Sequence, residues 1–446
     1  MLYSILLGAT LVAQACAQLT GSVGPLLSAY HKGNVKVCDI RNYGATSSAD
    51  VGPPIVAAWT ACAAVGGLVY IPPGSWPLRT RVDVRGGAGN SIAIQWDGTI
   101  YRDSTTMTYQ MFTFTNVNDF ELFSGNSKGA LQGYGYQYLS TGTYGVRMMR
   151  LVGVTNFSVH GIAFVDSPSY YIVFDTCSKG EVYNLILRGS TTLGATDGID
   201  VTGDNMWLHD IEVTNGDECV TVKSPASNFL IQGIYCNRSG GTAIGSLGLD
   251  TAIENIQYQH LYMNEADACF LKSNGGSGYV TNVSWRDVTV HGSAYPLTID
   301  LAWGTDNGGP GITVSNLEWM NYFGYNDVHT RAAIRLQCSD SAPCYGLTLN
   351  NVHMWTSDGG VVTYGCTDAY GVGACMVNKP ASPKPAAYTS VQSVTTTSSL
   401  VGAATMAADF KTALSPTGTI AIPAIPTSFY PGQTPQSALL ALTTVI

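Results

Sequence analysis

A nine-residue pattern repeats through the middle of the chain and limits what it can fold into. In nearly all of eight segments, positions 2, 4, 7 and 9 are apolar and position 6 is Gly, Asp, Asn or His. Alternating apolarity interrupted by a turn-prone residue predicts a strand, a sharp bend and a second strand. The segments begin at Asn156, Lys179, Asn205, Asn228, Asn255, Asn282, Gly311 and Gly346.

The spacing of these segments favours a solenoid. Their starts lie 23 to 35 residues apart, and a repeat of that length with period-two apolarity is typical of stacked coils. A propeller of the WD type would need longer, four-stranded units, and an immunoglobulin-like sandwich would not give this repeat. The sequence therefore predicts an all-β fold, a right-handed parallel β-helix.

The two ends of such a solenoid need caps, because an open sheet edge pairs with other chains. Residues 50–64 predict an amphipathic helix over the N-terminal end, with two prolines in its first turn. Residues 68–74 indicate the first strand and turn. We place the β-helical domain at residues 18–376. Residues 377–446 are rich in Ser, Thr, Pro and Ala and lose the repeat, so we expect a tail packed along the outside, the alternative being a glycosylated linker.

The start of the chain predicts export. An apolar run at residues 4–13 ends in Ala15-Cys16-Ala17, a cleavage pattern of secretory signal peptides. We therefore expect residues 1–17 to be removed and the protein to be secreted. The run is too short for a transmembrane anchor, and no later stretch supplies one. The net charge of −9 argues against nucleic acid as a partner, since nucleic acid attracts basic patches.

The cysteines fit secretion, because disulfides form in the oxidising compartments through which exported proteins pass. Their neighbours in the sequence suggest four disulfides and leave Cys177 and Cys269 as buried thiols. Neither a C-x-x-C pair nor an H-E-x-x-H motif is present, so we expect no zinc site. Three sequons, at Asn156, Asn237 and Asn282, are candidate glycosylation sites. The suggested disulfides are Cys38–Cys62, Cys219–Cys236, Cys338–Cys344 and Cys366–Cys375.

Two acidic clusters occupy consecutive turns of the repeat. Asp197 and Asp200 follow one nine-residue unit, and Asp217 and Glu218 follow the next. Because neighbouring coils stack at about 4.8 Å, carboxylates one coil apart come within roughly 5–10 Å of each other. Glycosidase pairs lie in that range, with an acid for the leaving oxygen and a base for the water.

Acids in turns also have a purely structural use, because they cap backbone amides. For Asp200 we favour capping, since it lies three residues from Asp197 and would face the other way in an extended segment. Asp217 and Glu218 fit this explanation poorly. Adjacent acids in a regular strand would send one carboxylate into the core, at a cost of several kcal/mol unless it is paired. Crowded carboxylates also raise one another's pKa, which yields one acid and one base.

The motifs around these acids resemble those of glycoside hydrolase family 28, whose members are secreted parallel β-helices that act on pectin. Ala195-Thr196-Asp197 and Gly216-Asp217-Glu218-Cys219 correspond to the Asn-Thr-Asp and Asp-Asp-Cys motifs of its polygalacturonases. Residues 239–246 lack the histidine of the third motif, and Phe270-Leu271-Lys272 keeps only the lysine of the fourth. The chain is similar instead to the rhamnogalacturonan hydrolase branch, through residues 18–26, 197–201, 217–225, 272–278 and 427–432.

This resemblance implies a reaction and roles for the acids. The enzyme would cleave the α-1,2 link between galacturonic acid and rhamnose within the chain, with inversion and without a cofactor. Asp217 would be the general acid, while Asp197 and Glu218 would position and deprotonate the water.

The resemblance also implies a local cation. Lys272 would bind a galacturonate carboxylate, and Lys223 is a second candidate for which a structural role is favoured. His291, which precedes Gly292 just after a nine-residue unit, is a candidate substitute for the missing histidine, the alternative being a turn histidine. Trp303 and Tyr295 are candidates for stacking on sugars, with packing as the default role.

Three other functions stay open at this point. The first is a polygalacturonase on the same scaffold, and the second is a calcium-dependent β-eliminase of the pectate lyase type. The third is a solenoid that binds polysaccharide without catalysis, which would not need clustered acids. The expected partner in the favoured interpretation is an acidic plant cell-wall polysaccharide. We expect a monomer that binds neither nucleic acid nor a membrane.

Overall fold

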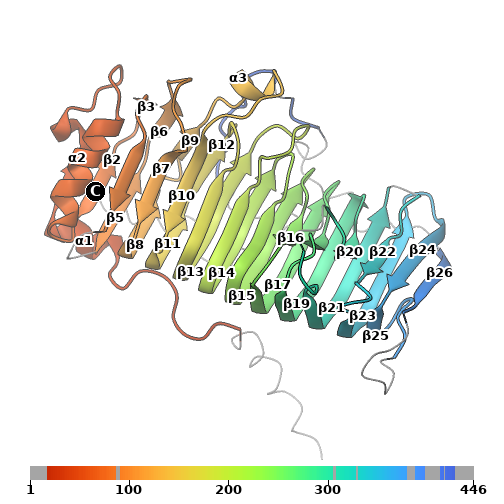
Figure 1. Cartoon of the computed structure of the whole chain (residues 1–446). Coiled ribbons are helices and arrows are strands. Elements are labelled where there is room, and N and C mark those ends of the chain that lie inside the picture. Colours follow the sequence, from red (N-terminus) through yellow and green to blue (C-terminus); the bar gives the residue numbers. More distant parts are fainter. Residues whose placement is uncertain are drawn as a thin grey trace, which may run out of the picture.

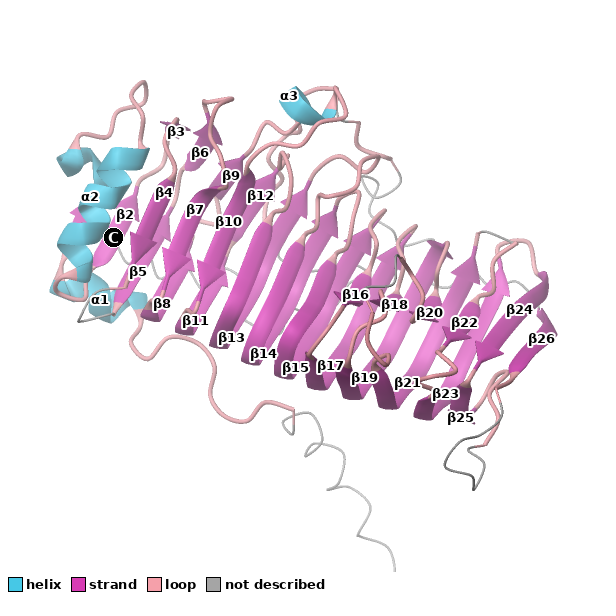
Figure 2. Cartoon of the chain, viewed as in Figure 1, coloured by secondary structure: helices cyan, strands magenta, loops and turns pink. Residues whose placement is uncertain are grey.

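The computed structural model describes residues 18–86, 91–304, 308–327, 330–378, 387–396, 412–415 and 417–426. The chain winds into a long stack of coils in which strands from successive coils lie side by side (Figure 1). Among the strands of the described residues, the pairs between coils are parallel except for β24 with β26, which is antiparallel. The described residues therefore form the predicted parallel β-helix, with strands along the whole stack, helices α1 and α2 at the N-terminal end and the short α3 farther along (Figure 2).

Short elements build the N-terminal coils. The helices are α1 (Ala29–Val35), α2 (Gly52–Ala63) and α3 (Tyr136–Leu139), with a 3-10 turn at Ile40–Tyr43. The strands are β1 (Val37–Asp39), β2 (Leu68–Ile71), β3 (Ser75–Leu78), β4 (Val82–Arg85), β5 (Ile92–Trp96), β6 (Thr99–Arg102), β7 (Gln110–Thr115), β8 (Asn118–Phe123), β9 (Gly129–Gln132), β10 (Arg147–Val152), β11 (Thr155–His160) and β12 (Ile162–Val165).

Longer strands that continue through the corners build the remaining coils. They are β13 (Ile172–Arg188), β14 (Ile199–Thr214), β15 (Val220–Asn237), β17 (Thr251–Asn264), β19 (Gly278–Ser293), β21 (Thr313–Asn326) and β23 (Cys344–Thr356). Shorter strands alternate with them: β16 (Thr242–Leu247), β18 (Cys269–Ser273), β20 (Leu297–Asp300), β22 (Ile334–Gln337), β24 (Gly360–Thr367), β25 (Ala369–Val372) and β26 (Thr389–Thr396).

The sharp bend predicted inside each repeat is confirmed by the backbone. Position 6 of every unit has a left-handed conformation, with φ between 52° and 70°, when the seventh unit is counted from Asn316 as the strand register requires. Glycine, asparagine and aspartate adopt this conformation at the lowest cost, which explains their prevalence at this position. The residues are Gly161, Asn184, Asp210, Gly233, His260, Asp287, Asn321 and Asn351.

Position 1 of the repeat is a second left-handed corner. Here asparagines stack between coils, because the Nδ2 of Asn255 donates to the Oδ1 of Asn228 at 3.1 Å and the Nδ2 of Asn282 donates to the Oδ1 of Asn255 at 3.3 Å. The ladder satisfies side-chain amides that face one another across the coil spacing. It explains why most units begin with asparagine.

One unit of the repeat begins later than predicted. In β21 the residue aligned with Asn282 is Asn316, because Val283 pairs with Leu317, so the prediction of a start at Gly311 is wrong by five residues. Both positions have positive φ, 97° at Gly311 and 57° at Asn316. Apolar residues alternate after Gly311 and after Asn316, so the sequence pattern alone did not show which of the two begins the unit.

Stacked aromatic rings fill part of the interior. The rings of Tyr258 and Trp285 lie 5.2 Å apart, and those of Trp285 and Trp319 lie 5.5 Å apart, with nearly parallel planes. Each ring comes from the same position of a successive coil. The stack therefore ties three neighbouring coils together through buried apolar surface.

Replacing Trp319 with alanine is expected to lower the free energy of unfolding by about 3–5 kcal/mol, because a fully buried indole leaves a cavity. Chemical denaturation followed by tryptophan fluorescence measures this difference. Tyr30, which is 63% exposed, provides the control, since Tyr30→Ala should change the unfolding free energy by less than about 0.5 kcal/mol. An equal change in both variants would contradict the importance of the stack.

The cysteines pair as predicted. Disulfides join Cys38 to Cys62, Cys219 to Cys236, Cys338 to Cys344 and Cys366 to Cys375. Cys177 and Cys269 are buried thiols. The first disulfide links α2 to β1.

Both ends of the described solenoid are covered. Helix α2 lies across the N-terminal end, as predicted, and the ring of Trp59 packs against Phe114 and Phe120 (Figure 1). The preceding helix α1 was not predicted. Strand β26 closes the other end by pairing with β24. Among the described residues, no helix has the length and apolarity needed to cross a bilayer.

Part of the C-terminal tail lies back along the outside of earlier coils. Ile420 and Ile425 pack with Ala130, Val165 and Ile186 on β9, β12 and β13. The backbone carbonyl of Ile420 also accepts a hydrogen bond from Gln132. The predicted signal peptide, residues 1–17, and the motif at residues 427–432 lie outside the described residues.

The three sequons differ in accessibility. Asn282 is exposed and Asn156 is half-buried, so both stay candidate glycosylation sites. Asn237 is 2% exposed, and its Nδ2 donates to the Oγ1 of Thr214 at 3.2 Å. An attached glycan would have to displace this buried contact, so the prediction for Asn237 is wrong for the folded protein.

Candidate active site

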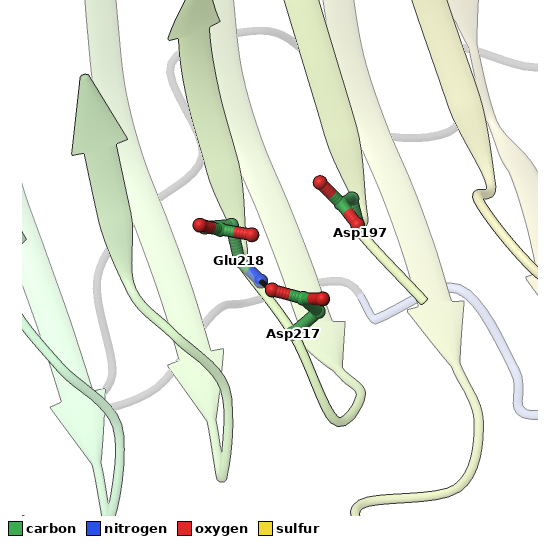
Figure 3. A group of neighbouring side chains, drawn as sticks. All are labelled: Asp197, Asp217 and Glu218. Atoms are coloured by element: carbon green, nitrogen blue, oxygen red, sulfur yellow. Dashed lines mark hydrogen bonds between the residues drawn. The ribbon is translucent and has the colours of Figure 1, made fainter. Parts of the chain in front are cut away.

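The three predicted catalytic acids meet where two neighbouring coils turn into their strands. Asp197 precedes β14, and Asp217 and Glu218 precede β15 (Figure 3). One carboxylate oxygen from each residue lies within 4.8 Å of the others. The structure therefore brings Asp197, Asp217 and Glu218 together at one place.

Hydrogen bonds within the two turns fix this arrangement. The backbone NH of Gly198 donates to the carbonyl of Glu218 at 2.8 Å, which sets the register between the coils. The side-chain amide of Asn215 donates to the carbonyls of Thr196 and Glu218 at 2.7 and 2.9 Å. Sequence reasoning missed Asn215, although its place just before the Gly-Asp-Glu-Cys motif was a usable signal. Residues 215–219 are not in a strand, so the side chains of the adjacent Asp217 and Glu218 do not have to point to opposite faces of a sheet.

Asp217 has the properties of a general acid. Burial raises its pKa, and a hydrogen bond and the negative charge of Glu218 raise it further, to about 7. Two backbone NH groups limit the rise: that of Ala195 donates to Oδ2 at 2.6 Å and that of Glu218 to Oδ1 at 2.9 Å. The side chain is also partly exposed. Asp217 thus holds a proton at mildly acidic pH where a substrate can reach it.

Glu218 has the opposite character. Burial alone would raise its pKa, but the hydrogen bond from Asp217 and the charge of Lys272 outweigh burial and lower the pKa to about 2. The ammonium group of Lys272 donates directly to Oε1 of Glu218. Two adjacent carboxyls with pKa values displaced in opposite directions form an acid and base pair.

Asp197 and Asp200 both lie in this cluster. Burial, followed by the charges of Asp200, Asp217 and Glu218, raises the pKa of Asp197 to about 9. The expectation that Asp200 only caps a turn and faces away is wrong. Asp197 lies in a turn, so strand alternation does not govern the pair, and the carboxylate of Asp200 lies 3.6 Å from the ammonium of Lys223.

Acids outnumber cations in this cluster. Four carboxyl groups, those of Asp197, Asp200, Asp217 and Glu218, lie near two ammonium groups, and the guanidinium of Arg147 also acts on the pKa of Asp200. Glu218 pairs with Lys272 and Asp200 pairs with Lys223. Buried carboxylates without a cation take up protons, which agrees with the raised pKa values of Asp197 and Asp217.

Both predicted binding lysines lie at the cluster, and both already have partners. Lys272 on β18 pairs with Glu218, and its Nζ lies 5.3 Å from the ring centre of Phe270 and 5.4 Å from that of Trp303. The Nζ of Lys223 donates to the carbonyl of Gly245 at 2.8 Å. This agrees with the structural role favoured for Lys223.

His291 does not join the cluster. The register runs from Thr214 to Asn237, Asn264 and then His291, so this histidine lies three coils away, at roughly 14 Å for a coil spacing of about 4.8 Å. It is 2% exposed, its ring meets that of Tyr325, and burial lowers its pKa. The prediction that His291 replaces the missing histidine is wrong, because its coil is too far along the stack.

Tyr170 is a site residue that sequence reasoning missed. Burial and then the charges of Asp197 and Asp200 raise its pKa to about 12. The guanidinium of Arg147 lies 4.5 Å above its ring. Tyr170 sits one coil before Asp197, since the NH of Tyr171 donates to the carbonyl of Asp197; the repeat spacing was the signal for it.

The spacing of Asp197, Asp217 and Glu218 also suits a metal ion. The group fits one less well, because Glu218 already pairs with Lys272. Calcium usually takes six to eight oxygen ligands, several of them charged. The donor set therefore favours proton transfer over metal binding.

The sequence and fold match known proteins. Residues 78–375 match the model for glycosyl hydrolases family 28. The chain belongs to this family. Among its relatives, a probable rhamnogalacturonase C of Aspergillus niger is 54% identical over 96% of this chain and 93% of its own length. Rhamnogalacturonase A of Aspergillus aculeatus is 50% identical over 98% of this chain and 99% of its own length.

Solved structures share the family 28 fold. A polygalacturonase from Erwinia carotovora matches with a TM-score of 0.62 and 15% identity, over 75% of this chain and 96% of its own. An endo-xylogalacturonan hydrolase from Aspergillus tubingensis matches with a TM-score of 0.58 and 21% identity, over 72% of this chain and 92% of its own. At these identities the likeness shows the fold and not the substrate.

Proposed function

We propose that the protein is a secreted endo-hydrolase of rhamnogalacturonan that cleaves the α-1,2 bond between galacturonic acid and rhamnose. The observation that carries this proposal is the pair of adjacent carboxyls, Asp217 with a pKa raised to about 7 and Glu218 with one lowered to about 2. The substrate follows from the relatives named rhamnogalacturonases, which match the chain over nearly its whole length.

The proton transfers follow from the two pKa values. Asp217 gives its proton to the bridging oxygen as the bond from that oxygen to the anomeric carbon of galacturonate breaks. Glu218 takes a proton from water, whose oxygen bonds to the same anomeric carbon. Rhamnose leaves with a hydroxyl, and galacturonate becomes a new reducing end. Proton exchange with solvent then restores Asp217 and Glu218.

We assign Asp197 to positioning the water. Its proton is retained up to a pKa of about 9, so it is a poorer base than Glu218 at working pH. Its Oδ1 is buried and has no hydrogen-bond partner in the described part of the chain. A water molecule between Asp197 and Glu218 would satisfy that oxygen and lie next to the base.

The proposal of inversion rests on the resemblance to family 28. Inverting pairs usually have carboxyl groups about 6.5–9.5 Å apart, with room for water. The nearest oxygens here lie within 4.8 Å of one another, which is closer than that range. The anomeric form of the first product is therefore the decisive observation for stereochemistry.

The substrate is tested by product analysis on two polymers. Saponified rhamnogalacturonan should yield oligosaccharides with galacturonate at the reducing end and rhamnose at the other, detected by chromatography and mass spectrometry. Homogalacturonan should yield at least about a hundredfold less product, since each mismatched sugar forfeits contacts in the cleft. Preferred cleavage of homogalacturonan would indicate a polygalacturonase. Unsaturated products lost on adding a chelator would indicate a lyase.

Secretion and a monomeric state belong to the same proposal. Four disulfides support an oxidising compartment. Helix α2 and strand β26 cover the two ends of the stack. This supports a monomer, because a covered sheet edge does not pair with a second copy of the chain.

The pH dependence of kcat/KM should reflect the two carboxyls. Asp217 must be protonated, so kcat/KM should fall tenfold per pH unit as pH rises through about 7. Glu218 must be ionised, so the acid limb should appear only as pH falls toward about 2. Initial rates on saponified rhamnogalacturonan from pH 3 to pH 9 measure the alkaline limb. A rate that rises through pH 7 would exclude Asp217 as the acid.

A further inference from the structure

Both lysines at the cluster already pair with carboxylates, Lys272 with Glu218 and Lys223 with Asp200. Arg147, whose guanidinium lies over the ring of Tyr170, is a further cation beside the acids, and it lies on their N-terminal side. The chain has a net charge of −9, and a polymer of galacturonate is negatively charged. A substrate that extends along the coils to the C-terminal side of the acids therefore calls for positive charge there as well.

Such charge lies in a hollow on the C-terminal side of the cluster. A cavity of about 360 Å³ is lined by Tyr295, Arg331, Arg335 and Gln337, together with small and hydroxyl-bearing residues of β24 and β26. The described residues of its lining include two guanidinium groups and no acid. We call it the arginine pocket.

The two arginines are held in different ways. The guanidinium of Arg331 lies 4.2 Å above the ring of Tyr295, and it forms no ion pair with an acidic residue of the described chain. Arg335 on β22 donates to Asp300 at 2.6 Å and to the side chain of Gln337. Asp300 is buried beneath it. Arg335 is thus fixed in place by Asp300, while Arg331 keeps its donors available.

The pocket lies on the same side of the coils as the catalytic cluster. The register runs from Lys272 to Asp300 and then to Gln337, so Gln337 lies two coils beyond Lys272, roughly 10 Å along the stack. Aromatic rings bridge this interval: Phe270 stacks on Tyr295 at 5.3 Å, and Trp303 meets Phe270 edge-on at 4.8 Å. Trp303 is 42% exposed.

We propose that the arginine pocket binds the carboxylate of a galacturonate residue in the substrate chain, about four coils, or roughly 19 Å, from the coil of Asp217 and Glu218 where the bond is cut. The proposal rests on the proposed function. Arg331 and Arg335 supply charge-assisted donors, and the guanidinium geometry matches a carboxylate. Tyr295 and Trp303 offer faces for the sugars that lie between the pocket and the catalytic acids.

A neighbouring hollow differs from the arginine pocket in its lining. It has a volume of about 400 Å³ and shares Gln337 and Thr367 with the arginine pocket, but none of the described residues that line it is charged. A carboxylate entering this region of the cleft is therefore drawn to the arginine pocket, where it would set the register of the acidic sugars.

Arg331→Gln tests the proposal, because Arg331 is exposed and forms no ion pair in the described part of the chain. Buried Asp267, on whose pKa the charge of Arg331 acts, keeps its hydrogen bonds from Ser293 and Tyr295 in the variant. We expect KM for saponified rhamnogalacturonan to rise about tenfold or more, in line with the loss of a charge-assisted hydrogen bond, while kcat changes less than about twofold. Arg331→Lys should recover part of the loss. On rhamnogalacturonan whose carboxyls have been reduced to alcohols, Arg331→Gln should behave as the wild type.

Arg286→Gln is the matched control. It removes the same charge from β19, where Arg286 pairs with Glu318 at 2.7 Å between two coil corners, and it should leave KM within twofold. An unchanged KM in Arg331→Gln would overturn the proposal, as would an equal rise in both variants or on the reduced polymer. Failure of the proposed function would look different, because the wild type itself would not cut the polymer. Calorimetric titration with galacturonate oligosaccharides would then still test the pocket.

Discussion

The Asp217→Asn variant is expected to lose roughly a hundredfold to ten-thousandfold in kcat on rhamnogalacturonan. A positioned general acid contributes about that factor, and asparagine has no proton to give at any working pH. The alkaline limb of the pH profile near 7 should vanish with it, because that limb reports the proton of Asp217. Initial-rate kinetics with reducing-end detection measure both effects.

Folding of this variant should change little. Asp217 accepts backbone hydrogen bonds from Ala195 and Glu218, and asparagine can accept only one of them, which costs about 1 kcal/mol. Asp287→Asn is the matched control, since Asp287 is an exposed corner acid that accepts from Asn321. It should keep full activity. A fully active Asp217→Asn enzyme would remove Asp217 from the mechanism.

The Glu218→Gln variant is expected to lose activity by a similar factor, because it removes the base. It should also move the alkaline limb to lower pH. Glu218 raises the pKa of Asp217 through a hydrogen bond and its charge, so glutamine lets that pKa fall below about 7. The residual rate should therefore decline earlier as pH rises than the wild-type rate does. Rate profiles of both enzymes over pH 4 to 8 compare the limbs.

The shift of the alkaline limb in Glu218→Gln shows whether Glu218 acts on Asp217 and the water or only supports the fold. Glu254→Gln on β17 makes the same change outside the cluster and should leave both rate and profile intact. If Glu218→Gln lowered the rate but left the limb at the wild-type pH, the coupling between the two carboxyls would be refuted. Full activity would instead leave Asp197 as the base.

Periodicity made most of the fold predictable from the sequence. Two left-handed corners in each coil demand residues such as asparagine and glycine, and these marked the repeat from Asn156 onward. The disulfides were predictable because each pair lies within one or two coils. The start of the seventh unit was misplaced at Gly311 because Gly311 and Asn316, five residues apart, both fit the apolar pattern.

The candidate site was predictable only where it follows the repeat. Asp197 and Asp217 occupy equivalent turns of neighbouring coils, so their meeting followed from the stacking. Asp200 was misjudged because alternation was applied to a turn. His291 was misplaced because the local Val-His-Gly motif does not show how many coils separate it from the acids.

Of the arginine pocket, the sequence indicated only Tyr295, as a candidate for stacking on sugars. Tyr295, Arg331 and Gln337 come together only through the register of successive coils and the turn before β22. Because the turns between strands differ in length, the sequence alone does not show which of their residues become neighbours.

The anomeric form of the first product tests the central claim most directly. Proton NMR during the first minutes of cleavage of saponified rhamnogalacturonan should show the new galacturonate reducing end in the β form, followed by slow conversion to the α form. That result is expected if Asp217 protonates the leaving oxygen while Glu218 directs water to the opposite face. An α product at the outset, or an unsaturated end in place of a reducing galacturonate, would contradict the account.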